Sequence, residues 1–302
     1  MAMKMVDVLI IGGGPAGLTA AVYAARAGLS TTVLGEFTGG QVASTAVVEN
    51  YPGFPSVYGP DLAQKLMEHA KSAGAELKQE NAEEFQLDGE VKTVRTSQGE
   101  YQAKAVILAQ GSHRRKLNIP GEEEFTGRGV SWCASCDGNF FRNKTTAVVG
   151  GGNTAAGDAI ELAGLCKKVY LLVRKELKAE YSLVQKVKSL QNVEVRTGVS
   201  AERIEGAQKV ERVVVAKPDG GEEAIPVDGV FVAIGVEPNT EHLPASLPLS
   251  EGFIAAPENG VTPIPGVFVA GDLRKKDLYQ IVTAVSDGAN AAYSAQQYLQ
   301  KK

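Results

Sequence analysis

The chain has 302 residues, of which 44% are hydrophobic and 22% charged, and its formal net charge is −4. This composition is ordinary for a soluble globular protein, and the length suggests two domains. The weak negative charge offers no positive surface, so we expect neither nucleic acid nor a membrane as a partner. Three cysteines cannot build the disulfide framework of a small secreted protein. Their small number favours a cytoplasmic protein with catalytic cysteines.

The first predicted unit is a strand, a glycine-rich loop, a helix and a second strand. The strand Val6–Ile11 is too short for a signal peptide and runs directly into Gly12-Gly13-Gly14-Pro15-Ala16-Gly17. A helix over 18–27 and a strand over 31–34 follow. This is a dinucleotide-binding fingerprint: Gly12 makes the tight turn, Gly14 lets a pyrophosphate approach the backbone, and Gly17 allows close packing of helix on strand. Glu36 is either the acid for a ribose hydroxyl or a solvated loop residue.

Loops, a helix and a small β layer follow. Segments 39–41 and 49–55 read as loops whose polar side chains, Gln41 and Asn50, suit the edge of a polar ring. We expect a helix over 61–73 and short antiparallel strands over 75–79, 83–87, 91–96 and 101–102. A buried strand over 105–109 ends at Gln110-Gly111, and the basic run 113–116 is either a solvated linker or a docking patch.

Cys133 and Cys136 have C-x-x-C spacing and are followed at once by Asp137. The spacing alone fits half a zinc site or a redox pair. Zinc needs about four ligands, and Cys166 and the three histidines do not stand at ligand spacing. We therefore expect no metal, a reversible disulfide at Cys133 and Cys136, and a buried structural thiol at Cys166.

A second fingerprint follows the dithiol. A strand over 146–149 leads into Gly150-Gly151-Gly152-Asn153-Thr154-Ala155, a helix to residue 163 and a strand over 168–173. Beyond that strand stand Arg174, Lys175 and Lys178, with Glu176 the only acid among them. Cations at this point favour a ribose 2′-phosphate, hence NADPH over NADH, unless they are only a surface cluster.

The remaining segments repeat the first half. Segments 193–198, 201–205, 210–216 and 223–226 read as another small β layer, closed by a buried strand over 227–235. A strand over 266–272 places Asp272 at its carboxyl end, where it either binds a ribityl or ribose hydroxyl or caps a helix. A final helix spans 279–300. The sequence predicts an α/β protein with two dinucleotide-binding domains.

Taken together, these stretches resemble the low-molecular-weight thioredoxin reductases, flavoproteins of the pyridine nucleotide–disulfide oxidoreductase class. The resemblance is carried by both fingerprints, by Gly39-Gly40-Gln41 and Glu49-Asn50-Tyr51-Pro52-Gly53, by Cys133 to Gly138, and by Gly271-Asp272. It implies two Rossmann-like three-layer domains of β-β-α type. The FAD domain would be discontinuous (1–112 and 243–302), and residues 113–242 would bind NADPH or NADH and carry the dithiol.

The resemblance also implies roles for residues. Cys136 would face the flavin, Cys133 would exchange with thioredoxin or a thioredoxin-like protein, and Asp137 would move the proton. The partners would include a second copy of the chain, as a homodimer. Rotation of one domain against the other would occur at hinges near 111–115 and 238–243. The implied cofactor contacts are Gly12, Gly14, Pro15, Ala16, Gly17, Gly35, Glu36, Gly40, Gln41, Asn50, Gly111, Gly271, Asp272, Gln280, Ile281 and Val282 for FAD, and Gly150, Gly152, Asn153, Thr154, Ala155, Arg174, Lys175 and Lys178 for the nicotinamide nucleotide.

Several positions depart from the family pattern. The family's basic run is one residue shorter here and contains Lys175 and Lys178, which lack the bidentate fork of arginine. Other departures are Trp132 before the first cysteine, Gln110 for a threonine, Gly157-Asp158 for an acidic pair and Tyr279 for an arginine. They leave open a non-nicotinamide donor such as ferredoxin. A flavin dithiol oxidase and a non-enzymatic redox sensor are further alternatives, which the second fingerprint and the intact dithiol disfavour.

Overall fold

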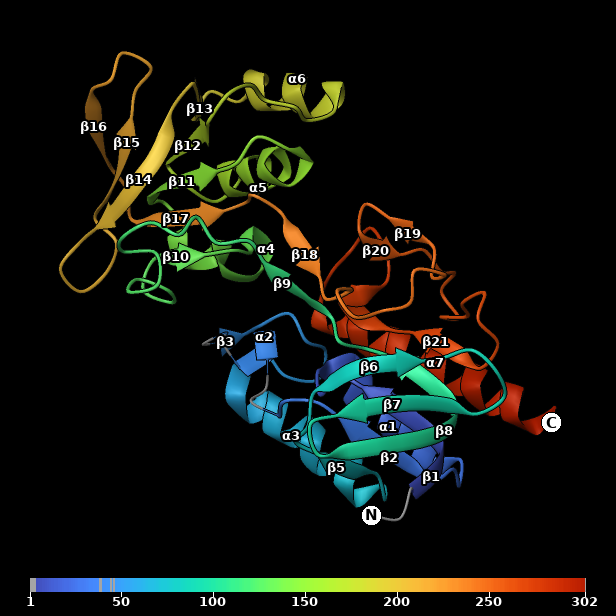
Figure 1. Cartoon of the computed structure of the whole chain (residues 1–302). Helices are drawn as coiled ribbons and strands as arrows, with labels where there is room; N and C mark the ends of the chain where they lie inside the picture. The colour runs from blue at the N-terminus through green and yellow to red at the C-terminus, as the bar shows by residue number, and fades with distance from the viewer. Residues whose placement is uncertain (1–3, 38–39, 44, 46, 302) are drawn as a thin grey trace. The chain divides into compact units, whose positions relative to one another are not determined.

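The computed structural model describes residues 4–37, 40–43, 45 and 47–301. The chain forms two compact units, one of residues 1–113 with 237–302 and one of residues 114–236 (Figure 1). The chain passes between the units within β9 (Ser112–Arg114) and β18 (Val236–Pro238), which pair with each other. The first unit is therefore discontinuous. The sequence prediction placed the return to this unit at residue 243, and the compact unit resumes at Glu237.

The first unit is built on a sheet ordered β5-β2-β1-β8-β7-β6, with β21 paired to β8. The strands parallel to β1 (Lys4–Ile11) are β2 (Thr31–Leu34), β5 (Glu76–Lys78), β8 (Gly99–Leu108) and β21 (Val267–Val269). β6 (Ala82–Gln86) and β7 (Lys92–Thr96) continue from β8 as an antiparallel layer. Alternate residues of β1 face opposite sides, so each face of the sheet has its own core.

Helices cover one of these faces. α1 (Pro15–Arg26) and α7 (Ile281–Gln300) pack on each other and on Val8 and Ile10, and α3 (Gly59–Ser72) packs on α1. Leu9 and Ile11 point the other way, into a core with Val94 of β7. Short elements complete the unit: α2 (Gly40–Ala43), β3 (Val47–Val48), β4 (Val57–Tyr58), β19 (Leu249–Ser250), β20 (Phe253–Ile254) and the 3₁₀ turn η2 (Gly271–Leu273).

The second unit repeats this plan with a wholly parallel sheet, ordered β10-β17-β11-β12-β13. Its strands are β10 (Val130–Ser131), β17 (Gly229–Val232), β11 (Thr145–Val149), β12 (Lys168–Val173) and β13 (Val193–Thr197). The helices are α4 (Ala134–Asp137), η1 (Gly138–Phe141), α5 (Asn153–Ala163) and α6 (Tyr181–Ser189). An antiparallel layer is formed by β14 (Ser200–Glu205), β15 (Arg212–Ala216) and β16 (Glu222–Pro226). Its buried side chains form one hydrophobic core with those of β11 and β17.

The prediction of two Rossmann-like three-layer domains, the first discontinuous, is confirmed. Several local predictions were wrong. Segment 75–79 was expected in an antiparallel layer, but β5 pairs in parallel with β2 because α3 carries the chain back across the sheet. The segment 193–198 was assigned to the small β layer and instead forms β13, the edge of the parallel sheet.

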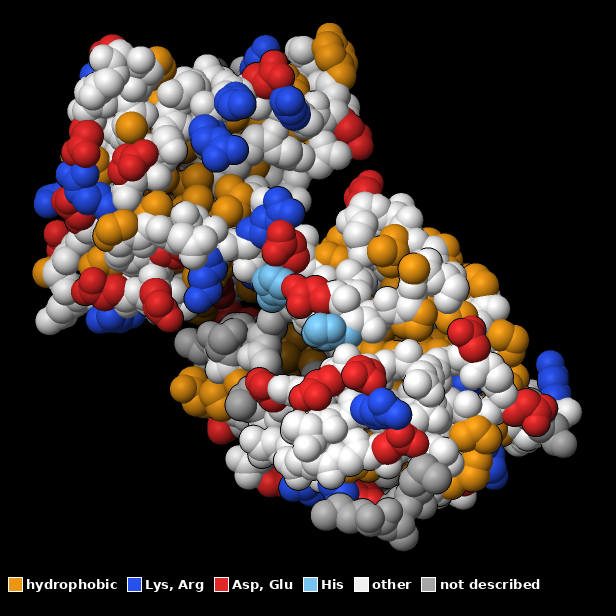
Figure 2. All heavy atoms as spheres, in the orientation of Figure 1, with side chains coloured by type: hydrophobic (Ala, Val, Ile, Leu, Met, Phe, Trp, Pro, Cys, Tyr) orange, Lys and Arg blue, Asp and Glu red, His pale blue; other side chains and the backbone are white. Residues whose placement is uncertain are grey.

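Two further predictions failed at polar positions. The two strands expected at 101–102 and 105–109 are one strand, β8, in which Lys104 interrupts the apolar pattern and pairs with Asp7 at 2.7 Å. Gln41, expected in a loop, lies in α2, and Gly39 lies outside the described residues. Over the described part of the chain, no helix has the length and apolar character needed to cross a membrane. Acidic and basic side chains are interspersed on the face shown in Figure 2.

Candidate active site: a disulfide and two dinucleotide loops

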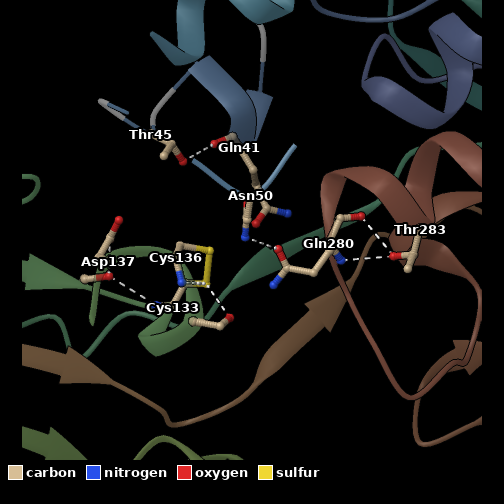
Figure 3. The surroundings of a disulfide bond; sticks show 10 residues. Gln41, Thr45, Asn50, Cys133, Cys136, Asp137, Gln280 and Thr283 are labelled. Atoms are coloured by element: carbon tan, nitrogen blue, oxygen red, sulfur yellow. Dashed lines mark hydrogen bonds between the residues drawn. A yellow bond between two sulfur atoms is a disulfide. The ribbon is translucent and has the colours of Figure 1, made fainter. Parts of the chain in front are cut away.

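Cys133 and Cys136 form a disulfide with an S–S distance of 2.05 Å (Figure 3). Cys133 precedes α4, and its Sγ accepts a hydrogen bond from the backbone N–H of Cys136 at 3.2 Å. The Ser135 hydroxyl lies 3.4 Å from the same sulfur. Both cysteines are half-buried. The pair predicted from C-x-x-C spacing therefore stands as a disulfide that remains partly open to solvent.

Asp137 is the last residue of α4. Its Oδ2 accepts a hydrogen bond from the Ser131 hydroxyl at 2.5 Å, and its backbone N–H donates to the Cys133 carbonyl at 3.1 Å. Burial raises the pKa of the Asp137 carboxyl, while the Ser131 hydroxyl and the Arg114 charge oppose that rise. A half-buried carboxyl with a raised pKa keeps its proton to higher pH than a solvated one, which suits delivery of a proton to a nearby sulfur.

A second acid of the same unit was not predicted as a site residue. Burial raises the pKa of Asp158 to about 7, with a further rise from Glu161 and an opposing effect of Arg114. Asp158 lies on α5, which packs against α4. Its neighbours at helical spacing, Ala155 and Leu162, are fully buried. An acid within the apolar stripe of a helix is the sequence signal that could have identified it.

The first dinucleotide loop has the geometry that its glycines predict. Gly12 has φ of 120°, and a Cβ there would lie 2.1 Å from the Ala109 carbonyl oxygen. A Cβ on Gly17 would lie 1.9 Å from the Gly12 carbonyl oxygen, so helix and loop meet at backbone distance. A Cβ on Gly14 would meet nothing within 4 Å. The open side at Gly14, at the N-terminus of α1, fits a pyrophosphate.

Polar groups from distant segments gather in the first unit. Asn50 Nδ2 donates to Gln280 Oε1 at 3.0 Å, and Gln280 caps α7 together with Thr283 (Figure 3). Gln41 Nε2 donates to the Ser112 carbonyl at 2.8 Å. Glu36 is exposed and accepts from Asn81 Nδ2 at 3.0 Å. Hydrogen bonds thus join each of these residues, predicted to bind the cofactor, to another segment of the first unit.

A buried ion cluster supports the end of β21. Asp287, 5% exposed, pairs with Arg274 at 2.8 Å and Lys276 at 3.1 Å and accepts from the Gly271 backbone N–H at 3.1 Å. Lys276 also pairs with Asp272 Oδ1 at 3.3 Å. In addition, Gln110 Oε1 is buried and accepts no hydrogen bond from the described residues. A buried acceptor beside the fingerprint and an open loop fit a bound dinucleotide with hydroxyl groups, such as FAD.

The second loop is more exposed. Gly150 is held against the Ala233 carbonyl, which a Cβ would approach to 2.2 Å, whereas a Cβ on Gly152 would meet nothing. Asn153 and Glu180 are joined by reciprocal hydrogen bonds of 3.1 and 2.8 Å. The Lys178 N–H donates to the Gly151 carbonyl at 2.7 Å, so the segment after β12 is fastened to the loop. This loop also fits a pyrophosphate.

The cations predicted to select the nucleotide follow β12 directly. Arg174 and Lys175 are exposed, and Lys178 pairs with Glu176 at 3.4 Å with both side chains largely exposed. Within the described residues, no group of three or more His, Cys, Asp and Glu side chains is placed to hold a metal ion.

The structure divides the predicted site residues between the two units. The first unit contains Gly12, Gly14, Pro15, Ala16, Gly17, Gly35, Glu36, Gly40, Gln41, Asn50, Gly111, Gly271, Asp272, Gln280, Ile281 and Val282. The second contains Cys133, Cys136, Asp137, Gly150, Gly152, Asn153, Thr154, Ala155, Arg174, Lys175 and Lys178. Sequence reasoning did not predict Ser131 as a site residue, and it interpreted Arg114, within the basic run 113–116, as a solvated linker or docking patch rather than as a neighbour of Asp137.

Comparison with known proteins decides the family. Residues 6–288 match the family model of the pyridine nucleotide-disulphide oxidoreductases. A thioredoxin reductase of Listeria innocua is 44% identical over 304 residues, covering 99% of this chain and 95% of its own. The chain belongs to the thioredoxin reductases of this family. A crystal structure of thioredoxin reductase from Streptococcus pyogenes matches with a TM-score of 0.94 and 39% identity over 100% of both chains.

Another thioredoxin reductase matches less closely. A ferredoxin-flavin thioredoxin reductase of Clostridium acetobutylicum is 31% identical, with a TM-score of 0.56 over 100% of both chains. Family membership and the Cys133–Cys136 disulfide together make this chain a flavin-dependent disulfide reductase. The family implies FAD and a nicotinamide nucleotide as cofactors.

Proposed function

We propose that this chain reduces the disulfide of a thioredoxin or a thioredoxin-like protein with electrons from NADPH or NADH. The Cys133–Cys136 disulfide, followed by the half-buried acid Asp137, is the observation that carries the proposal. Bound FAD would take a hydride from the nicotinamide and pass an electron pair to this disulfide. The first unit would hold FAD through the Gly12–Gly17 loop, and the second would hold the nicotinamide nucleotide through the Gly150–Ala155 loop.

The protein's own residues then manage two electrons and two protons. Opening the disulfide with an electron pair would give two thiolates, and protonated Asp137 would supply a proton to the Cys136 thiolate. The Cys133 thiolate attacks the disulfide of the thioredoxin and forms a mixed disulfide. The Cys136 thiol then returns its proton to Asp137 and attacks Cys133 Sγ, which restores the disulfide. The two thiolates released on the thioredoxin take up two protons from water. Dithiol and partner disulfide thus exchange oxidation states with no other reductant.

The connecting strands are the proposed hinge. Beside the crossing points, His113 Nδ1 lies 2.8 Å from Asn239 Oδ1 and His113 Nε2 lies 3.1 Å from Glu237 Oε2. Both strands are only three residues long, which suits a segment that absorbs rotation. We further propose a homodimer in the cytoplasm, where reduced thiols are maintained.

NADPH is the preferred donor in this proposal. Arg174 and Lys175 are exposed beyond β12, where a 2′-phosphate would lie. Glu176 offsets part of this charge by pairing with Lys178. We therefore expect NADPH to be preferred, with NADH also used.

Anaerobic titration tests the function. Yellow protein should be bleached by NADPH at lower concentration than by NADH, and oxidised thioredoxin should then restore the colour. Protein that binds no FAD, or whose flavin is reduced by neither nucleotide, would contradict the proposal. A second candidate function is a disulfide reductase that takes its electrons from a ferredoxin, and the similarity to the C. acetobutylicum enzyme favours it. Reduction of the flavin by a ferredoxin alone would support this candidate. Bleaching only by a small dithiol would indicate an oxidase.

A further inference from the structure

Gln110 carries an unexplained buried acceptor. It follows β8, and its Oε1 is shielded from solvent without a hydrogen bond from any described residue. A buried amide oxygen without a partner is costly, and native proteins satisfy nearly all such groups. Its partner is therefore to be sought in something that the protein binds.

The backbone of Gln110 is firmly placed. Its carbonyl accepts a hydrogen bond from Asn239 Nδ2 at 2.8 Å, and a Cβ on Gly12 would lie 2.9 Å from its amide nitrogen. The next strand, β21, is in register with β8, with the Ala270 N–H donating to the Leu108 carbonyl at 2.9 Å. Gln110 therefore stands beside the first fingerprint, next to the strand end that carries Asp272.

Strand order indicates which part of a dinucleotide reaches Gln110. Ligands of such sheets lie across the carboxyl ends of the strands, with the pyrophosphate at the loop after β1. β2, followed by Glu36, is on one side of β1, and β8, followed by Gln110, is on the other. If the adenosine ribose lies toward Glu36, the other half of FAD extends over the ends of β8 and β21. The hydroxyl donors nearest the pyrophosphate in that half belong to the ribityl chain.

We propose that Gln110 Oε1 accepts a hydrogen bond from a ribityl hydroxyl of FAD and thereby positions the cofactor's flavin half. This inference rests on the proposed function, because it requires FAD in the first unit. The resemblance expects a threonine at this position, which is too short to place an acceptor at the same point. Gln110 is thus a cofactor-binding residue, and its buried oxygen is satisfied only when the cofactor is bound.

The proposal predicts effects of opposite sign on the apoprotein and on cofactor binding. Gln110→Met keeps the volume but removes the acceptor. The apoprotein should melt at the same or a higher temperature, because a buried unsatisfied oxygen is gone. Affinity for FAD should fall about tenfold, while affinity for ADP, which lacks the ribityl chain, should not change. Gln98→Met, at an exposed turn, is the matched control and should alter none of these values.

The measurements are melting of the apoproteins and titration with FAD and ADP, followed by flavin fluorescence and by competition. A lower melting temperature for Gln110→Met apoprotein, or equal weakening of FAD and ADP, would mean a structural role and overturn the inference. Unchanged FAD affinity would overturn it too, while leaving the proposed function intact. Failure of the wild-type apoprotein to take up FAD would instead refute both. Gln110→Thr provides a second variant, expected to weaken FAD without affecting ADP.

Discussion

The two dinucleotide loops of this chain share one backbone design and differ in their surroundings. The first loop has buried polar groups from distant segments near it, namely Gln110 Oε1 and the Asp287 cluster behind Gly271, although Glu36, Gln41 and Asn50 are exposed. Around the second, Gly152, Asn153 and Thr154 are exposed, and so are the cations after β12. Buried groups suit a ligand that stays bound, since it completes their hydrogen bonds. Exposed groups suit a ligand that arrives and leaves in each cycle.

A change at the dithiol tests this difference between the loops most directly. It should abolish thioredoxin reduction and leave the reaction between the nicotinamide nucleotide and the flavin intact. Cys136→Ser should lower thioredoxin reduction by at least about a thousandfold, since no disulfide can form or reopen. Reduction of the bound flavin by a nicotinamide nucleotide should persist in the same variant. The check is a steady-state thioredoxin assay beside anaerobic flavin bleaching. Cys166→Ser, at the buried thiol outside the site, is the control and should retain activity.

A variant that reduces thioredoxin at the wild-type rate would remove the proposed role of Cys136. If Cys136→Ser lost both flavin bleaching and thioredoxin reduction, the reaction between the two loops would depend on the dithiol.

The second prediction concerns the buried ion cluster of the first unit. Asp287→Asn removes the carboxylate shared by Arg274 and Lys276, which leaves the buried Arg274 guanidinium without this acid and Lys276 paired with Asp272. We expect the free energy of unfolding to fall by about 3–5 kcal/mol. Glu223→Gln breaks a more exposed ion pair, with Arg196 on the outer layer of the second unit, and should cost about 0–1 kcal/mol.

Denaturant unfolding of both variants measures this difference. Equal losses would contradict the contrast between a buried framework in the first unit and a solvated one in the second.

The proton step is the third test. Asp137→Asn should slow dithiol reduction about a hundredfold, the usual contribution of a general acid. The sign of the pH dependence follows from the role: the donor must be protonated, so the rate falls as pH rises through the pKa of Asp137. The Ser131 hydroxyl lowers that pKa. Ser131→Ala should therefore move the alkaline limb of the pH profile to higher pH, and a shift to lower pH would contradict the assignment.

The sequence predicted the repeated fold because glycine spacing is a local signal. Gly12 and Gly17 meet at backbone distance, and no larger residue fits there. Pairing between distant strands was predicted less well, since β5 and β13 are too short to show which neighbour they join. The cysteines and Asp137 form a local motif, so the disulfide could be predicted. Contacts between residues far apart in the sequence could not be predicted. For example, the Asn239 side chain that donates to the Gln110 carbonyl is 129 residues away.

The smallest effect concerns the exposed cations of the second loop. Arg174→Ala should raise the KM for NADPH about tenfold and leave the KM for NADH nearly unchanged, because in the proposed site the guanidinium would contact only the 2′-phosphate. Glu176→Gln should act oppositely and lower the KM for NADPH slightly, since it removes the acid that pairs with Lys178. Flavin content should be the same in both variants, because we propose that FAD binds at the other loop. A parallel rise in KM for both nucleotides would mean that Arg174 binds a group they share. Loss of FAD would mean that the two loops are not separate sites.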